Sequence, residues 1–193
     1  MTNTSALQPT VIFVGPPSSG KGDRSTDAAN NFDAWRWCSG EYFRDKLQAG
    51  DDQETMHSGG LVEVDTFKAA VMDAIRSAPR DRLLILDGVA KKRGEAPWLV
   101  DFLKENGRYV ALVIFLDITR EVAQERKRQA DRADDAPEVQ DRRWDVYLSD
   151  TLGESIPYLQ DHCPFIRING DDTPENIQAE IDTAISRCLE LAA

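Results

Sequence analysis

The residues with the clearest chemical potential form a glycine-rich loop near the start of the chain. The segment Gly15-Pro16-Pro17-Ser18-Ser19-Gly20-Lys21-Gly22 comes directly after the apolar run at 10–14 and before a helical pattern at 23–31. A glycine-bounded loop between a buried strand and a helix points several backbone N–H groups into one hollow, where the lysine adds a positive charge. The phosphates of a nucleotide fit such a hollow. Their expected ligands are Gly15, Ser18, Ser19, Gly20, Lys21 and Gly22.

A second chemical feature is an acid at the end of another apolar run. The residues at 83–86 are all leucine or isoleucine, and Asp87 and Gly88 follow them. Taken alone, Asp87 fits a helix cap or a turn as well as a metal ligand. Together with the phosphate loop it has the Walker-B arrangement, in which a carboxylate at the carboxyl end of a strand holds Mg2+. We therefore expect Asp87 to bind Mg2+ through water.

Arginines supply the third feature. Arg126, Arg128, Arg132 and Arg143 lie in or beside the polar segment 129–137, which is a candidate mobile flap. Paired guanidinium groups on a closing flap can stabilise the negative charge that spreads over a phosphoryl group during its transfer. The alternative is a plain surface loop flanked by solvated helix faces.

These residues need a scaffold, and the hydrophobic pattern predicts one. Five strand-like runs alternate with seven helix-like runs, which predicts a parallel sheet covered by helices on both faces. The strands are expected at 10–15, 34–38, 82–87, 109–116 and 164–168, and the helices at 20–31, 40–49, 62–77, 94–106, 118–130, 138–160 and 173–191. A ligand should then bind at the carboxyl ends of the strands, where the glycine-rich loop lies.

Composition limits the choice of partners. The 193 residues suit one domain, and 23 Lys plus Arg against 34 Asp plus Glu give a net charge of -11. This balance argues against binding to nucleic acid polymers or anionic membranes. The chain contains no run of about 18 apolar residues and no signal-peptide pattern at its start. We therefore expect a cytoplasmic protein, with Cys38, Cys163 and Cys188 as free thiols.

Taken in order from about 11 to 181, the motifs resemble those of the adenylate kinases and related nucleoside-monophosphate kinases with a short lid. Besides the phosphate loop, the matching segments are 38–44, 60–65, 87–91, 132–143 and 169–170. The resemblance implies a three-layer P-loop sandwich with a five-stranded parallel sheet. Within a single domain spanning 1–193, it places an acceptor-binding region at about 39–68 and a lid at about 129–137.

The same resemblance implies a reaction and its residues. The reaction is reversible transfer of the γ-phosphoryl group of Mg2+–ATP to AMP or another nucleoside monophosphate, by an enzyme that we expect to be a monomer. The catalytic positions are Lys21, Arg132 and Arg143. The acceptor positions are Ser39, Gly40, Arg44, Leu61, Val62, Gly88, Lys91 and Glu95. The further donor positions are Asp23, Asn169, Gly170, and Arg126 and Arg128, one of which would stack on the donor base.

Among the departures from the family pattern, four bear on the chemistry of the site. Ser18 replaces a glycine, Asp23 a threonine, Lys91 an arginine and Glu95 a base-reading glutamine. A carboxylate accepts but does not donate hydrogen bonds, so the acceptor base is left open. Two other functions also stay open: a regulatory nucleotide-binding protein that has lost catalysis, and a P-loop kinase of another small metabolite.

Overall fold

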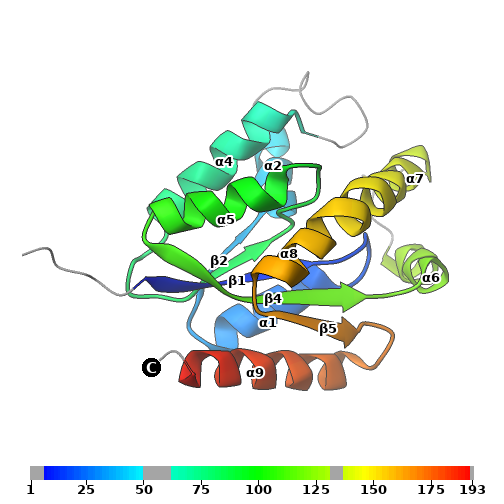
Figure 1. Ribbon diagram of the computed structural model, residues 1–193. Helices are drawn as coiled ribbons and strands as arrows, with labels where there is room; N and C mark the ends of the chain where they lie inside the picture. The colour runs from blue at the N-terminus through cyan, green and yellow to red at the C-terminus, as the bar shows by residue number, and fades with distance from the viewer. Residues whose placement is uncertain (1–6, 50–61, 131–136, 192–193) are drawn as a thin grey trace, which may run out of the picture.

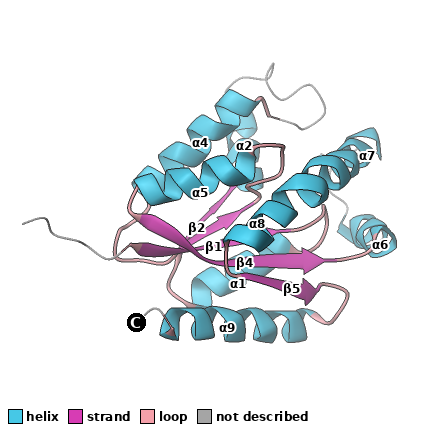
Figure 2. Ribbon diagram, viewed as in Figure 1, coloured by secondary structure: helices cyan, strands magenta, loops and turns pink. Residues whose placement is uncertain are grey.

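The computed structural model describes residues 7–49, 62–130 and 137–191. A five-stranded parallel sheet lies between two layers of helices (Figures 1 and 2). Its strands are β1 (Gln8–Val14), β2 (Trp35–Cys38), β3 (Leu84–Asp87), β4 (Arg108–Asp117) and β5 (Phe165–Asn169), in the order β2-β3-β1-β4-β5. The expected three-layer parallel architecture is confirmed.

Helices cover both faces of this sheet. α1 and α9 lie on one face, while α4, α5 and α8 lie on the other (Figure 1). The helices are α1 (Lys21–Asn31), α2 (Ser39–Gln48), α4 (Val64–Ser77), α5 (Glu95–Glu105), α6 (Arg120–Ala130), α7 (Pro137–Val146), α8 (Ile156–His162) and α9 (Pro174–Glu190), with a π-helix, η1 (Tyr147–Ser155), between α7 and α8.

The single helix expected at 138–160 is instead three consecutive segments, α7, η1 and α8. In the π-helical part the backbone hydrogen bonds reach one residue further than in an α-helix. Pro157 lies just after it and has no N–H to close a regular turn onto Gly153. Residue periodicity does not reveal such a change of hydrogen-bond spacing, which is why the pattern reads as one helix.

Alternating side chains of the strands build two cores. Phe13 and Ile85 pack with Ile181 of α9 on one face of the sheet. Ile12 and Leu99 belong to the core on the other face. Because both faces of each inner strand are buried, the strand sequences are continuously apolar, as the sequence pattern suggested.

The register of the sheet brings three strand ends together. Asp87, the last residue of β3, pairs with Cys38 at the end of β2 and with Phe13 near the end of β1. All strands are parallel, so the loop after β1, the start of α2 and the segment after β3 meet at one edge. This edge holds most of the residues to which the sequence assigns chemistry.

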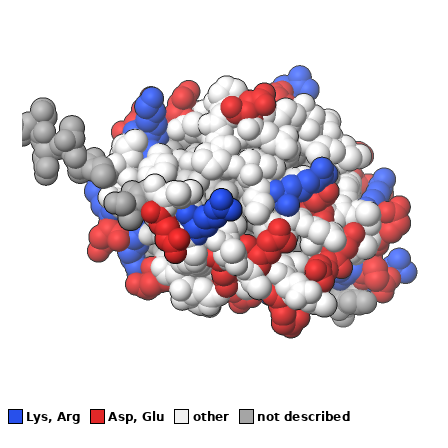
Figure 3. All heavy atoms as spheres, turned by 60° about the horizontal axis from the view of Figure 1, so that its bottom comes forward, with Lys and Arg blue, Asp and Glu red and all other residues white. Residues whose placement is uncertain are grey.

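The surface carries mixed charge. In the face turned forward from the bottom of Figure 1, acidic and basic side chains alternate with uncharged areas (Figure 3). None of the helices in the described ranges is both long and apolar enough to span a bilayer.

Ile85 offers a direct test of the fold. It is 0% exposed and lies in an inner strand, so Ile85→Ala should lower the free energy of unfolding by about 2–5 kcal/mol. Urea unfolding followed by circular dichroism measures this. The matched control is Val64→Ala, at a side chain that is 41% exposed, where we expect a change of about 0.5 kcal/mol or less. Equal effects of the two substitutions would contradict the burial of β3.

Candidate functional site

The glycine-rich loop has the backbone of an anion site. It joins β1 to α1 and ends at the helix N-terminus, where N–H groups and the helix dipole favour negative charge. Gly15 has φ 146°, and a Cβ there would lie 2.4 Å from the carbonyl oxygen of Leu116. Gly20 has φ 86° directly before α1. A side chain at Gly15 would clash with the backbone of Leu116, and the positive φ of both Gly15 and Gly20 favours glycine.

Lys21 is folded back onto this loop. Its Nζ donates to the carbonyl oxygens of Gly15 at 2.9 Å and Pro16 at 2.7 Å, and to Ser19 Oγ at 3.0 Å. Burial of the ammonium lowers the pKa of Lys21 to about 8, although the nearby Asp87 carboxylate opposes that shift. A bound polyphosphate would give this ammonium a stronger partner than the three neutral oxygens.

Ser18, which replaces a glycine of the family pattern, has an unfavourable backbone conformation. Its φ is 60°, in the left-handed region that favours glycine. A residue with a side chain there costs about 1–3 kcal/mol and persists only where its surroundings enforce it. The replacement of glycine by Ser18 therefore strains the phosphate loop.

Asp87 is buried behind the loop, and the sequence missed two of its neighbours. Its Oδ2 accepts a hydrogen bond from Ser25 Oγ at 3.1 Å and lies 3.5 Å from a guanidinium nitrogen of Arg36. Arg36 stands in β2 between Trp35 and Trp37. A charged residue inside a short strand between two tryptophans is unusual, and this signal could have identified Arg36 from the sequence.

A single protein carboxylate at this place is consistent with Mg2+. Within the described ranges, no cluster of three His, Cys, Asp or Glu side chains forms a metal site. Mg2+ in kinases takes one or two carboxylates and completes its shell with water and substrate phosphates. Asp87, beside the phosphate loop, therefore fits as the residue that would hold Mg2+ through water.

The structure brings together Ser39, Gly88 and Lys91, which the sequence assigns to acceptor binding. Ser39 Oγ donates to the carbonyl oxygen of Gly88 at 2.7 Å and accepts from Lys91 Nζ at 3.1 Å. A Cβ on Gly88 would lie 2.5 Å from Ser39 Oγ. Lys91 is exposed as a whole residue, but burial of its ammonium lowers its pKa, with Asp87 opposing the shift.

The first two turns of α2 add Gly40 and Arg44. A Cβ on Gly40 would lie 3.3 Å from Nη1 of Arg44, so the guanidinium lies along the glycine. Val62 stands at the start of the next described segment, and Leu61 lies outside the described residues. The structure thus brings Ser39, Gly40, Arg44, Gly88 and Lys91 to one edge of the sheet.

The backbone after β3 departs from the family pattern. Ala90 has φ 54°. Its segment, 87–91, resembles the family motif Asp-Gly-Phe-Pro-Arg, which has proline at this position. Because proline is held near φ -65°, it could not take this conformation. The segment that carries Lys91 therefore follows its own path in this chain.

Glu95 holds that segment in place. It is 2% exposed, and its Oε2 accepts hydrogen bonds from the backbone N–H groups of Lys91 at 2.8 Å and Lys92 at 3.1 Å. Burial raises the pKa of Glu95, and these two bonds oppose the shift. Lys92 in turn donates from Nζ to the carbonyl oxygen of Val62 at 2.6 Å. The base-reading role of Glu95 stays a prediction.

The π-helix holds the same segment from the other side, which sequence reasoning missed. Thr151 Oγ1 donates to the carbonyl oxygen of Lys91 at 2.7 Å, and Glu154 Oε1 accepts from the N–H of Gly94 at 2.8 Å. η1 continues from α7, which carries Arg143. Burial of the ammonium is the main cause of the lowered pKa of Lys91, and the positive charge of Arg143 contributes to it. The two cations therefore lie near each other. Arg132 lies outside the described residues.

The structure gives different surroundings to Arg126 and Arg128, which the sequence assigns to the donor nucleotide. Arg126 donates to the carbonyl oxygens of Gly170 at 2.6 Å and Ser19 at 3.4 Å, so it bridges the phosphate loop and the turn after β5. Asn169 precedes that turn at the end of β5. Arg128 is 72% exposed and pairs with Glu125. Asp23 is exposed in the first turn of α1, where a carboxylate is favourable.

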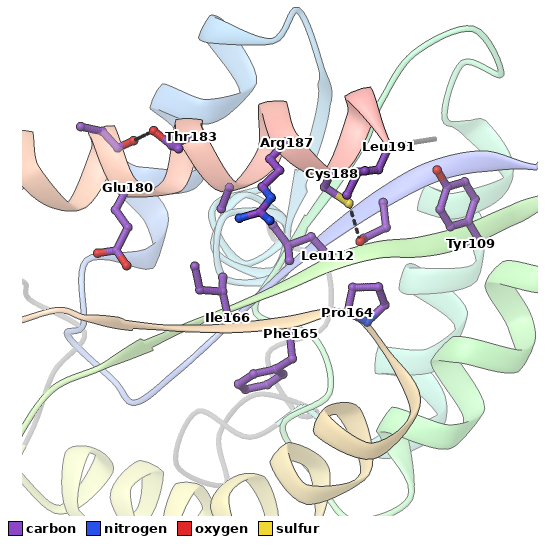
Figure 4. Close-up of a pocket in the computed structure, with 13 residues that line it drawn as sticks. Tyr109, Leu112, Pro164, Phe165, Ile166, Glu180, Thr183, Arg187, Cys188 and Leu191 are labelled. Carbon is purple, nitrogen blue, oxygen red and sulfur yellow. Dashed lines mark hydrogen bonds between the residues drawn. The ribbon is translucent and has the colours of Figure 1, made fainter. Parts of the chain in front are cut away.

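A groove of about 740 Å³ lies at the opposite end of the sheet, between α9 and the amino-terminal halves of β4 and β5 (Figure 4). Its walls are mostly apolar, with Leu112, Phe165 and Ile166 among them, and Arg187 reaches into it from α9 (Figure 4). The groove includes none of the residues assigned to phosphate binding.

Comparisons with known proteins point to one family. The family model described as adenylate kinase matches residues 13–183. An adenylate kinase 1 from Nostoc sp. is 29% identical over 180 residues, which cover 91% of this chain and 97% of that protein. An adenylate kinase from Xanthomonas euvesicatoria is 27% identical over 186 residues, covering 92% of this chain and 99% of that protein.

Ser18→Gly tests the strain in the loop. Glycine adopts φ 60° without a steric penalty, so the substitution should raise the free energy of unfolding by about 1 kcal/mol. Chemical denaturation measures it. The same substitution at Ser149, an exposed residue in helical backbone, should lower the free energy by about 0.5 kcal/mol. A loss of stability in both variants would show that Ser18 is not strained.

Proposed function

The chain belongs to the adenylate kinase family of phosphotransferases, and from this premise we propose that it transfers the γ-phosphoryl group of ATP reversibly to a nucleoside monophosphate. The main support for the proposal is that two groups of residues, each with a lysine, lie at the same edge of the sheet. Lys21 and the loop N–H groups form the donor side, and Lys91 with Ser39 forms the acceptor side. The negative charge of Asp87 acts on both lysines and opposes the lowering of their pKa values by burial.

On the donor side, the loop N–H groups and Lys21 would bind the β- and γ-phosphates. Arg126 and the turn at Asn169-Gly170 would lie against the rest of ATP, because Arg126 already joins that turn to the loop. When bound, Mg2+ would neutralise charge on the transferring phosphates, with Asp87 holding its water shell.

On the acceptor side, Arg44 and Lys91 would hold the monophosphate, with Ser39 fixing the lysine. The transfer needs no side-chain nucleophile. An oxygen of the acceptor phosphate attacks the γ-phosphorus, and the bond from that phosphorus to the β,γ-bridging oxygen breaks. Arg143, with Arg132 from the lid, would stabilise the charge on the moving group. Closure of the lid would exclude water.

AMP is the first acceptor to consider, because the family and both relatives are named for adenylate kinase activity. Lys91 keeps the charge of an arginine but loses its two-pronged geometry, and Glu95 does not donate hydrogen bonds. The acceptor is therefore proposed as AMP or another nucleoside monophosphate. We propose that the protein works as a monomer in the cytoplasm, with ATP and the monophosphate as its partners.

A second candidate is a regulatory nucleotide-binding protein without catalysis. Two observations favour it: Ser18 strains the phosphate loop, and Lys21 is satisfied by that loop's own oxygens. Both features would make the free energy of ATP binding less favourable without abolishing binding.

An assay of ADP formation with ATP, Mg2+ and each of AMP, GMP, CMP and UMP separates these functions. We expect turnover with at least one acceptor and none in Lys21→Ala, which lacks the ammonium at the phosphate loop. ATP binding without turnover on any acceptor would replace the proposed reaction by the regulatory function. A failure to bind ATP would reject both.

Arg143→Ala should lower turnover by about 10^3-fold while changing the dissociation constant of ATP by less than about tenfold, because the guanidinium acts on charge that develops during transfer. Steady-state kinetics and calorimetry measure the two quantities. Arg142→Ala removes the same charge from an exposed neighbour on α7 and should leave turnover near that of the unmodified protein. Unchanged turnover in Arg143→Ala would remove Arg143 from the phosphate clamp.

A further inference from the structure

Arg36 is a cation that the proposed reaction does not use. It lies in β2, between two tryptophans, and its side chain is only 12% exposed. Burial of a charged group is costly unless it is paired and hydrogen-bonded. The partners of Arg36 therefore indicate what its charge is for.

One side of the guanidinium faces the proposed metal carboxylate. Its Nε donates to Ser25 Oγ at 2.8 Å, and that hydroxyl lies 3.1 Å from Oδ2 of Asp87. Nη2 lies 3.4 Å from the carbonyl oxygen of Gly22 and 3.5 Å from the same Oδ2. Arg36 thus supplies positive charge to the oxygen atoms that surround Asp87.

The other side of the guanidinium faces the acceptor helix. Nη1 and Nη2 donate to the two carboxylate oxygens of Glu41 at 2.7 and 2.8 Å. Glu41 lies in the first turn of α2, and this hydrogen bonding lowers the pKa of its carboxyl group. The charge of Arg36 is therefore shared between two carboxylates, Glu41 and Asp87.

We propose that Arg36 is a positioning residue that acts as the internal counter-cation of Asp87 and so weakens the preference of the donor site for metal-bound over metal-free ATP. The inference rests on the proposed function, since it needs ATP at the phosphate loop. A guanidinium beside Asp87 repels a dication that approaches the same carboxylate. The carboxylate of Glu41 offsets part of the positive charge of Arg36, which weakens this repulsion.

This assignment predicts opposite effects for two substitutions. Arg36→Gln removes the competing cation, so the site should favour the metal complex more strongly. Glu41→Gln removes the carboxylate that offsets the charge of Arg36, so more positive charge acts at Asp87 and the site should favour the metal complex less. A residue that only tied β2 to α2 would give effects of the same sign, because either substitution breaks the same pair.

The measurement is the dissociation constant of a non-hydrolysable ATP analogue, by calorimetry, once with Mg2+ and once with EDTA. The ratio of the two constants reports the coupling between metal and nucleotide, independently of catalysis. Arg36→Gln should raise the preference for the metal complex about tenfold. Glu41→Gln should lower it by roughly threefold. Arg82→Gln, which removes a charge near the amino end of β3 instead, should leave the ratio unchanged.

Each outcome decides the inference. An unchanged or lowered preference in Arg36→Gln overturns it, as does a raised preference in Glu41→Gln. Should Arg36→Gln fail to fold, the Glu41→Gln result stands on its own. Absence of analogue binding by the unmodified protein overturns the proposed function and this inference together, whereas tight binding with an unaltered ratio in both variants overturns this inference alone.

Discussion

The rest of the site depends on the compensation of one buried negative charge. Asp87 ends an inner strand whose neighbours are apolar, so its carboxylate needs partners that the core does not supply. Ser25 and Arg36 provide them directly, and Lys21 and Lys91 add positive charge from either side. The same carboxylate therefore lies between the phosphate loop and the segment after β3, and its charge acts on the lysines of both. Because the overall charge is -11, an anionic ligand needs such a local concentration of cations to bind.

The segment after β3, which we propose binds the acceptor, is held by contacts with other elements rather than by its own sequence. Glu95 binds its backbone from α5, and Thr151 binds it from η1. These bonds compensate for a left-handed residue, Ala90, in the middle of the segment. Such strain is typical of functional segments, where surrounding structure enforces a conformation that the chain alone would not choose. The position of Lys91 therefore depends on three helices, α2, α5 and η1, and on strand β3.

Local patterns were enough to predict the five strands, their parallel arrangement and the phosphate loop, because each depends on residues adjacent in sequence. Asp87 could be placed because the end of an apolar run marks the end of a strand. Arg36, Ser25 and Glu154 were missed because their roles arise from contacts between distant segments. The φ of Ser18 and the π-helical turns of η1 were missed for another reason: they are backbone conformations that residue type does not dictate. At Ala90, where the family motif has proline, the backbone has a positive φ that proline could not adopt.

The uninterrupted rod formed by α7, η1 and α8 has a mechanical consequence. Its first residues adjoin the segment that the sequence identifies as the lid, and its middle holds the acceptor segment through Thr151 and Glu154. A rotation of the rod at its α7 end would also turn its middle, and would therefore shift the segment that carries Lys91.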